Sequence, residues 1–116
     1  MTVALDYVSH KNALSNNNVS NNKEGISLYY SHYNRLIGNN VSKNRGKGIS
    51  LFFSNNNMLS GNNVSNNPRG IVLDSSNNNT LTRNNITNNN YGIELPDSSN
   101  NTIYDNLFNN RENIVG

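Results

Sequence analysis

The stretch "GNNVSKNRGKGISL" occupies residues 38–51, and a near copy, "GNNVSNNPRGIVL", follows at residues 61–73. Near copies this close together indicate a repeated structural unit rather than a single functional motif. Pairs of Gly and an aliphatic residue recur at spacings of 23, 22 and 22 residues, beginning at Gly25, Gly48, Gly70 and Gly92. The repeat reads approximately L-x-x-N-N-[VI]-[ST]-x-N-x-x-G-[IV]-x-L-x-x-S-x-x-N, and the chain contains about five copies.

The apolar residues of each repeat favour short strands over helices. A helix needs apolar residues at i, i+3, i+4 and i+7 over ten or more positions, whereas here Asn and Gly interrupt every apolar segment. A "GIxL" segment instead places Ile and Leu on one face of a brief strand. Such a strand buries its face only when it stacks on its copies, so the repeat predicts a β-solenoid.

Stacking in register predicts four apolar columns inside the solenoid. They would contribute about 6–10 kcal/mol of transfer free energy per coil, before the cost in conformational entropy. The expected columns are Ile26/Ile49/Ile71/Ile93, Leu28/Leu51/Leu73/Leu95, Leu14/Leu36/Leu59/Leu81/Ile103 and Val19/Val41/Val64/Ile86/Phe108.

The abundant Asn residues have two expected roles. Asn tolerates the left-handed backbone region at tight corners, and identical amides one coil apart can form hydrogen-bonded ladders. Gly25, Gly48, Gly70 and Gly92 are expected to supply a corner that a side chain would block. The predicted ladders are Asn17/Asn39/Asn62/Asn84/Asn106 and Asn34/Asn57/Asn79/Asn101.

Composition excludes several classes of protein. Hydrophobic residues make up 33% of the chain and charged residues 14%, while the net charge of +2 is far from the basic patch that nucleic-acid binding requires. There is no Cys, hence no disulfide framework or thiolate metal site. No apolar run is long enough to span a membrane, and the N-terminus lacks the pattern of a signal peptide.

The pattern "NNVSNN…GIxLxxSxNN" resembles the parallel β-helix repeats of the NosD-like family. Two rival repeat folds do not match, because no copy has the Leu density of a leucine-rich repeat and "GGxGxD" does not occur. The resemblance runs from about Val3 to Val115 and implies an all-β, right-handed, single-stranded parallel β-helix of about five coils, forming one domain over residues 1–116. NosD-like proteins are periplasmic or surface proteins, and their namesake is linked to copper-site maturation. The same repeat occurs in surface-layer-type proteins and in pectate-lyase-like, carbohydrate-active β-helices.

Two small clusters are candidates for chemistry. By register, Asp74 and Asp97 are diagonal neighbours on adjacent coils, at about 5–8 Å, a separation that could serve hydrolysis; the alternative is two solvated turn acids. His10 and His32 are 22 residues apart and should stack, so they could share a metal ion, with copper suggested by the resemblance. The alternative is two ordinary surface histidines.

The aromatic residues form the most informative cluster. Register is expected to place Tyr7, Tyr29 and Phe52 in one outward column and Tyr30 and Phe53 in the next, inward one. With Tyr33 and Arg35 nearby, the outward rings could bind a polysaccharide or cell-surface glycan; inward rings would be a core stack. The segment Arg45–Lys47 carries one extra residue and is expected to form a basic bulge, and Glu24 could pair with Lys47 across one coil.

These observations leave three functional hypotheses. The leading one is a non-catalytic β-helix of an extracellular, cell-surface or periplasmic protein, with a structural or carbohydrate-binding role. The alternatives are a copper-related accessory module resembling NosD, and the remnant of a polysaccharide lyase or hydrolase. Because the first and last coils look incomplete, the chain is also expected to be part of a longer β-helix or to stack on a second copy of itself.

Overall fold

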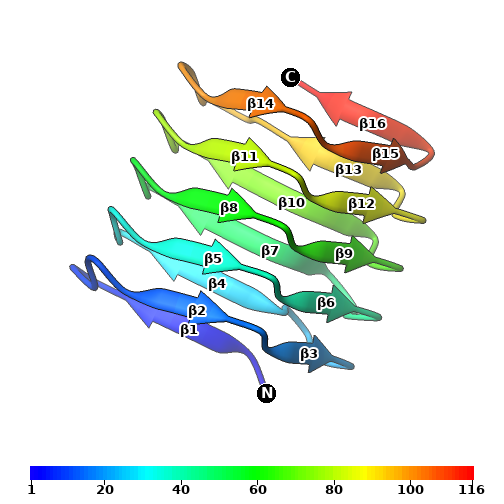
Figure 1. Cartoon of the computed structure of the whole chain (residues 1–116), viewed down its shortest axis with the longest axis horizontal. Coiled ribbons are helices and arrows are strands. Elements are labelled where there is room, and N and C mark those ends of the chain that lie inside the picture. Colours follow the sequence, from blue (N-terminus) through cyan, green and yellow to red (C-terminus); the bar gives the residue numbers. More distant parts are fainter.

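The repeat folds as a parallel β-helix. A computed structural model describes all residues from Met1 to Gly116, and it contains sixteen strands and no helix. Each strand pairs in parallel with its copies in the adjacent coils, so three sheets run along the solenoid, with edge strands only in the first and last coils (Figure 1). This arrangement confirms the predicted all-β solenoid. The chain has no helix long and apolar enough to cross a membrane.

Three strands from each coil supply the three sheets. Sheet A contains β1 (Val3–Asp6), β4 (Ile26–Tyr29), β7 (Lys47–Phe52), β10 (Arg69–Asp74), β13 (Tyr91–Glu94) and β16 (Glu112–Val115). Sheet B contains β2 (Ala13–Ser15), β5 (Arg35–Ile37), β8 (Met58–Ser60), β11 (Thr80–Thr82) and β14 (Thr102–Tyr104). Sheet C contains β3 (Asn18–Ser20), β6 (Asn40–Ser42), β9 (Asn63–Ser65), β12 (Asn85–Thr87) and β15 (Leu107–Asn109).

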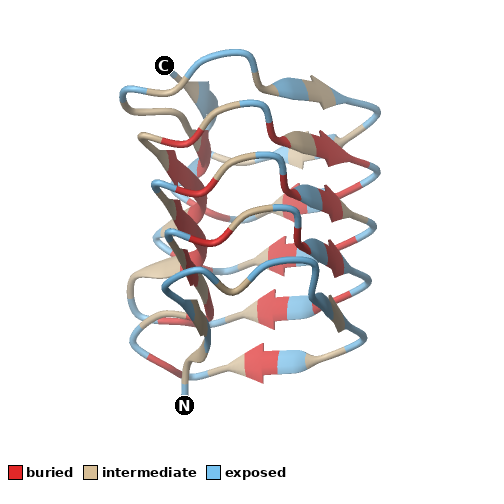
Figure 2. Ribbon diagram, turned by 90° about the vertical axis from the view of Figure 1, so that its left-hand side faces the viewer, coloured by how far each residue is buried: buried red, intermediate tan, exposed pale blue.

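The core is a stack of aliphatic side chains between the three sheets. In the third coil, Ile49, Leu51, Leu59 and Val64 are all fully buried, and each lies between identical or similar residues of the adjacent coils. The four predicted columns are therefore confirmed. Burial weakens toward both ends of the solenoid, where Leu14, Ile103 and Phe108 are only partly covered (Figure 2).

Each coil turns at corners that share one design: a residue in the left-handed region is followed by a buried polar side chain. At one such corner Asn56 has φ 59° and precedes Asn57, and at another Gly61 has φ 66° and precedes Asn62. The left-handed residue reverses the chain, and the polar residue after it binds the backbone of neighbouring coils. Asn thus has two separate roles, since the turning Asn is exposed and the following Asn is buried.

The buried Asn side chains form continuous ladders. Asn39 shows the pattern: its backbone N–H and its Nδ2 both donate to Oδ1 of Asn62, at 2.9 and 3.0 Å, and Nδ2 also donates to the Leu14 carbonyl at 2.9 Å. Both predicted ladders are present, and Asn12 extends the second. The structure adds a third, Asn22/Asn44/Asn67/Asn89/Asn110, and a Ser ladder, Ser31/Ser54/Ser76/Ser98.

Gly48 shows why the repeat keeps a Gly at the start of its longest strand. A Cβ there would lie 2.7 Å from the Gly70 carbonyl oxygen and 2.9 Å from Nδ2 of Asn67. A side chain is blocked there, as predicted, but Gly48 lies within β7 and not at the predicted corner, so the requirement is close packing between coils and not an unusual φ. Just before it lies the expected bulge, in which the three residues Arg45–Lys47 lie opposite only Lys23 and Glu24.

Candidate functional site

The outer face of sheet A carries an aromatic ladder, which we define as Tyr7, Tyr29, Tyr30, Phe52 and Phe53. Tyr29 and Phe52 are the last residues of β4 and β7, and the other three rings come from the turns directly after β1, β4 and β7. Tyr7, Tyr30 and Phe53 are 66%, 37% and 39% exposed, while Tyr29 and Phe52 are half-buried. All five rings therefore reach solvent.

The register of this ladder differs from the predicted one by one residue. Tyr29 is paired with Asp6, not with Tyr7. Tyr7 instead donates its backbone N–H to the Tyr29 carbonyl, which places it beside Tyr30 and Phe53. The prediction was wrong because paired residues of β1 and β4 are 23 positions apart in the sequence. The predicted column assumed a spacing of 22 between Tyr7 and Tyr29.

The second column also points outward, contrary to the prediction that Tyr30 and Phe53 face the core. Simple alternation from Leu28 and Leu51 would turn these rings inward. However, Tyr7, Tyr30 and Phe53 have φ values of 44°, 50° and 47°, so the backbone is no longer extended there. A residue with left-handed backbone at the strand end directs its side chain to the outer face. The next residue, Ser31 or Ser54, then points inward and is buried.

The rings stack along the solenoid axis and meet edge to face across it. Ring centroids are 5.3 Å apart for Tyr29–Phe52 and 5.0 Å for Tyr30–Phe53, with parallel planes. Within one coil, Tyr29 and Tyr30 meet at 4.7 Å and 85°. Parallel rings 5.0 Å apart cannot be coplanar, because their edge carbons would fall inside the roughly 3.5 Å contact distance. The two columns are therefore offset stacks in a herringbone, which leaves edges and oblique faces open to a ligand.

Carboxylates lie at both ends of the Tyr29 column. The paired positions run Asp6, Tyr29, Phe52 and Asp74 across β1, β4, β7 and β10. The Tyr7 hydroxyl beside it, together with partial desolvation and the Asp6 charge, raises the pKa of the Tyr29 phenol above its ordinary value. Tyr29 therefore stays a neutral hydrogen-bonding group at physiological pH.

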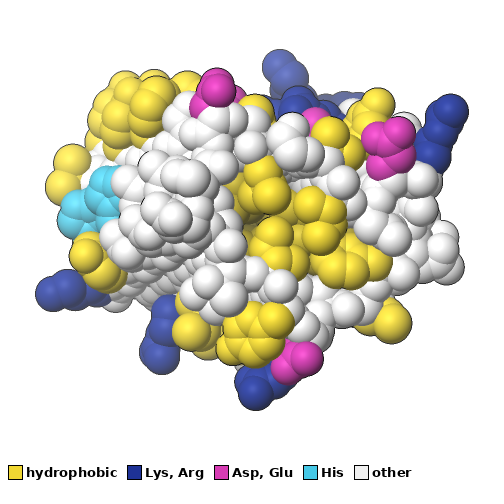
Figure 3. All heavy atoms as spheres, turned by 90° about the horizontal axis from the view of Figure 1, so that it is seen from above, with side chains coloured by type: hydrophobic (Ala, Val, Ile, Leu, Met, Phe, Trp, Pro, Cys, Tyr) yellow, Lys and Arg dark blue, Asp and Glu magenta, His cyan; other side chains and the backbone are white.

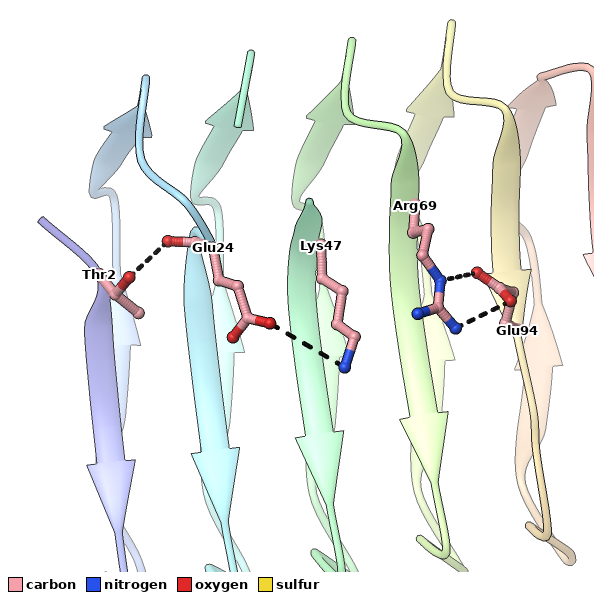
Figure 4. A network of polar contacts seen from close by, with 5 residues as sticks. All are labelled: Thr2, Glu24, Lys47, Arg69 and Glu94. Atoms are coloured by element: carbon pink, nitrogen blue, oxygen red, sulfur yellow. Dashed lines mark hydrogen bonds and ion pairs between the residues drawn. The ribbon is translucent and has the colours of Figure 1, made fainter. Parts of the chain in front are cut away.

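A row of charged residues crosses sheet A away from the ladder, toward the N-terminal ends of its strands (Figure 4). Arg69 makes a two-pronged ion pair with Glu94 on the next coil, with Nε–Oε1 at 2.6 Å and Nη2–Oε2 at 3.0 Å. This pairing raises the pKa of Arg69 above its ordinary value. Lys47 lies 4.0 Å from Glu24, as predicted, so both basic side chains of this row have an acidic partner. The Arg69–Glu94 pair was not predicted, because it crosses diagonally between two columns.

The remaining predicted carbohydrate-binding residues lie around a corner from the ladder. Arg35 is on β5 in sheet B, and Tyr33 is in the turn before it. Both are exposed, but neither is among the ring contacts of the aromatic ladder. Their predicted role in carbohydrate binding stays a prediction, separate from the aromatic ladder.

The two candidate catalytic acids occupy adjacent coils, in the predicted register. Asp74 ends β10 and Asp97 lies in the turn after β13, opposite Ser75. The Asp74 carboxylate accepts a hydrogen bond from the Ser75 hydroxyl at 3.0 Å, and Asp97 is exposed. No pocket forms around them or elsewhere on the surface.

His10 and His32 stack, as predicted, with centroids 5.0 Å apart. Nδ1 of His10 accepts the His32 backbone N–H, and Nδ1 of His32 accepts that of Asn55, both at 2.9 Å. Asn55 and Asn77 continue the same ladder through their Oδ1 atoms. The two histidines thus take the place of Asn in a structural column. In the end view they lie at the rim of the molecule, beside hydrophobic side chains (Figure 3).

The molecule is therefore a parallel β-helix with one aromatic, partly charged outer face. A family model described as "Periplasmic copper-binding protein (NosD)" matches residues 3–116, and the chain belongs to this NosD family. This confirms the resemblance drawn from the repeat.

Among solved structures, the chain is similar to two crystal structures of mutants of the periplasmic alginate epimerase AlgG. A single mutant aligns with a TM-score of 0.80 and 23% identity, covering 91% of this chain and 36% of that chain. A double mutant aligns with a TM-score of 0.63 and 20% identity, covering 91% and 39%. The chain thus spans little more than a third of these proteins, and the likeness shows the fold alone. The comparison with curated proteins found no match.

The family description names copper binding, and His10 and His32 are the predicted metal ligands of this chain. Their hydrogen bonds show whether they could bind a copper ion. A histidine that binds a metal through one ring nitrogen usually donates the other as N–H to a carbonyl or carboxylate. Here Nδ1 of both rings accepts a backbone N–H, which places the ring proton on Nε2 and leaves that atom without a lone pair. The chain has no group of three His, Cys, Asp or Glu residues arranged for a metal ion. His10 and His32 as arranged do not fit a copper ion.

Proposed function

We propose that this chain is a non-catalytic, carbohydrate-binding β-helix of a periplasmic or cell-surface protein. The observation that carries the proposal is the aromatic ladder, whose five rings all reach solvent on one outer face. Aromatic side chains that are exposed in a contiguous group generally mark a surface that binds something. The matching family and the similar AlgG structures are both described as periplasmic, which supports a periplasmic or cell-surface location.

The geometry of the ladder suits an extended saccharide chain. The rings advance by about one coil, roughly 4.8 Å, along the solenoid, so a linear glycan lying along the axis could meet one ring edge or oblique face per step. Tyrosine hydroxyls on three of the rings can donate to or accept from sugar hydroxyls. AlgG, whose structure is similar, is named an epimerase of the polysaccharide alginate, which adds support for a polysaccharide ligand.

A binding assay with matched variants tests this proposal. Oligosaccharides would be titrated by calorimetry against the wild type, Tyr30→Ser and Tyr104→Ser. Serine suits position 30 because Ser75 occupies the equivalent left-handed position two coils away. Losing one stacking ring should weaken binding roughly five- to ten-fold, about 1 kcal/mol. Tyr104 is exposed on sheet B, so its variant should bind like the wild type.

The same samples test whether the chain is an enzyme. Incubation with each polysaccharide should leave its chain length and sugar composition unchanged. Cleavage or epimerisation that is lost in Asp74→Asn would overturn the non-catalytic part of the proposal. Absence of binding to every saccharide, with intact folding by circular dichroism, would leave only a structural role.

A further inference from the structure

We infer that the aromatic ladder recognises a glycan containing amino sugars with free ammonium groups, in preference to a uronic-acid glycan such as alginate. The inference rests on the proposed function and adds the chemical class of the ligand. Its basis is the placement of charge around the rings.

Acidic residues lie at both ends of one column of the ladder and beyond one end of the other. Asp6 and Asp74 lie at the two ends of the Tyr29–Phe52 column. The parallel column, which begins with Tyr7, continues past Phe53 to Ser75 and Asp97. Thus two carboxylates, Asp6 and Asp74, lie one coil from a ring, and a third, Asp97, lies two coils beyond Phe53.

The basic residues of the same face have their closest acidic partners elsewhere, although the charge of Arg69 also interacts with Asp74. Arg69 is held in its two-pronged pair with Glu94, and Lys47 is 4.0 Å from Glu24 (Figure 4). Each of these cations therefore has its own acidic partner on the face. At the ends of the Tyr29–Phe52 column, the carboxylates of Asp6 and Asp74 therefore attract cationic ligands and repel uronates.

The ends of the ring stacks add a second attraction for ammonium groups. Within a column each ring covers part of the face of the next, so the terminal rings have the freer faces, although Tyr7 also meets Tyr29 edge to face at 5.0 Å. The terminal ring Phe52 lies one coil from Asp74, and the terminal ring Tyr29 lies one coil from Asp6. An ammonium group placed between ring and carboxylate gains both a cation–π contact and an ion pair.

The separation of the two sites indicates a polymer rather than a single sugar. Asp6 and Asp74 are three coils apart, about 14 Å at the usual strand spacing. One monosaccharide cannot reach both. An oligomer of several amino sugars lying along the axis could contact the rings between them and place an ammonium group at each end.

The test compares three oligosaccharides of equal length: a chitosan oligomer, its fully N-acetylated counterpart and an alginate oligomer. At low salt the chitosan oligomer should bind the wild type at least ten-fold more tightly than the other two, and the difference should shrink as salt is added. Asp74→Asn and Asp6→Asn should each weaken chitosan binding several-fold without changing binding of the N-acetylated oligomer. Asp105→Asn, at an exposed turn between sheets B and C, is the matched control.

The outcomes separate this inference from the proposed function. Binding of some oligosaccharide without preference for the amino sugar, or with equal or tighter binding of alginate, would overturn the inference and leave the carbohydrate-binding function standing. Unchanged chitosan affinity in both Asp74→Asn and Asp6→Asn would also overturn it. Failure of all three oligosaccharides, and of every other glycan tested, would overturn both.

Discussion

At the scale of single residues, the ionisation of Tyr29 is a measurable probe of the aromatic ladder in solution. The neighbouring Tyr7 hydroxyl is the main cause that raises its pKa above the ordinary value of about 10. In an alkaline titration followed by ultraviolet absorbance, we expect one of the six tyrosines to ionise after the others. Tyr29→Phe should remove that late step, and Tyr7→Phe should move it to lower pH. A single common transition in the wild type would contradict the contact between Tyr7 and Tyr29.

The same residue gives a pH dependence of stability with a definite sign. A phenol whose pKa is raised by folding holds its proton more tightly in the native state than in the unfolded chain. The stabilisation is therefore fully present below about pH 10 and is lost as the pH rises through the native pKa of Tyr29. Denaturation midpoints measured on both sides of pH 10 should fall less in Tyr29→Phe than in the wild type.

Tyr30 shows a limit of prediction from sequence at this scale. The repeat identifies the aromatic residues as a cluster, but alternation alone assigns the wrong direction to Tyr30 and Phe53. The error arises because left-handed backbone is expected from Gly, Asn and Asp, and its cost for other residues is about 1–2 kcal/mol. Stacking between the exposed rings, worth about 0.5–1.5 kcal/mol per pair, offsets part of that cost.

At the scale of elements, the polar ladders are as much a part of the fold as the strands. The spacing of "NN" pairs predicts two ladders, and the structure contains both. The ladder through Asn44 and Asn67 was not predicted because its members differ in context: one follows Lys43 and the other Asn66. The Ser ladder was also missed, since a hydroxyl such as that of Ser54 is usually assigned to a turn.

Neighbouring Asn residues of one element should respond very differently to mutation. Asn62 is 1% exposed, accepts from Asn39, and donates to the Leu36 carbonyl and to Asn84. Asn62→Ala leaves these buried groups without partners, so we expect a loss of about 2–4 kcal/mol in the free energy of unfolding. Asn63 is exposed beside it, and Asn63→Ala should change stability by less than about 0.5 kcal/mol. Urea denaturation of both variants makes the comparison; equal effects would show that the ladder is not continuous.

At the scale of the whole molecule, the first and last coils present complementary surfaces. In both ladders the backbone N–H of each Asn donates to Oδ1 of the Asn one coil later in the chain. The last coil therefore ends with free backbone N–H donors, at Asn101 and Asn106. The first coil begins with free Oδ1 acceptors, at Asn12 and Asn17. The donors and acceptors belong to the same two columns. Hydrophobic side chains gather at the centre of the end face (Figure 3), and Ile103 is partly exposed there.

For residues 1–116 on their own, this complementarity predicts that copies associate head to tail. Such a contact is heterologous and does not close on itself, so it produces open rods of increasing length. Sedimentation velocity over a hundred-fold range of concentration should therefore show a rising sedimentation coefficient for the wild type. Ile103→Lys should abolish the rise, because its ammonium group would lie in the contact, whereas Tyr104→Lys on the outer face of the same strand should keep it. Leu14→Lys places the charge on the opposite end and should act like Ile103→Lys. A wild type that remains monomeric over the whole range, with native circular dichroism, would rule out the association, because the free ladder ends would then be satisfied by water.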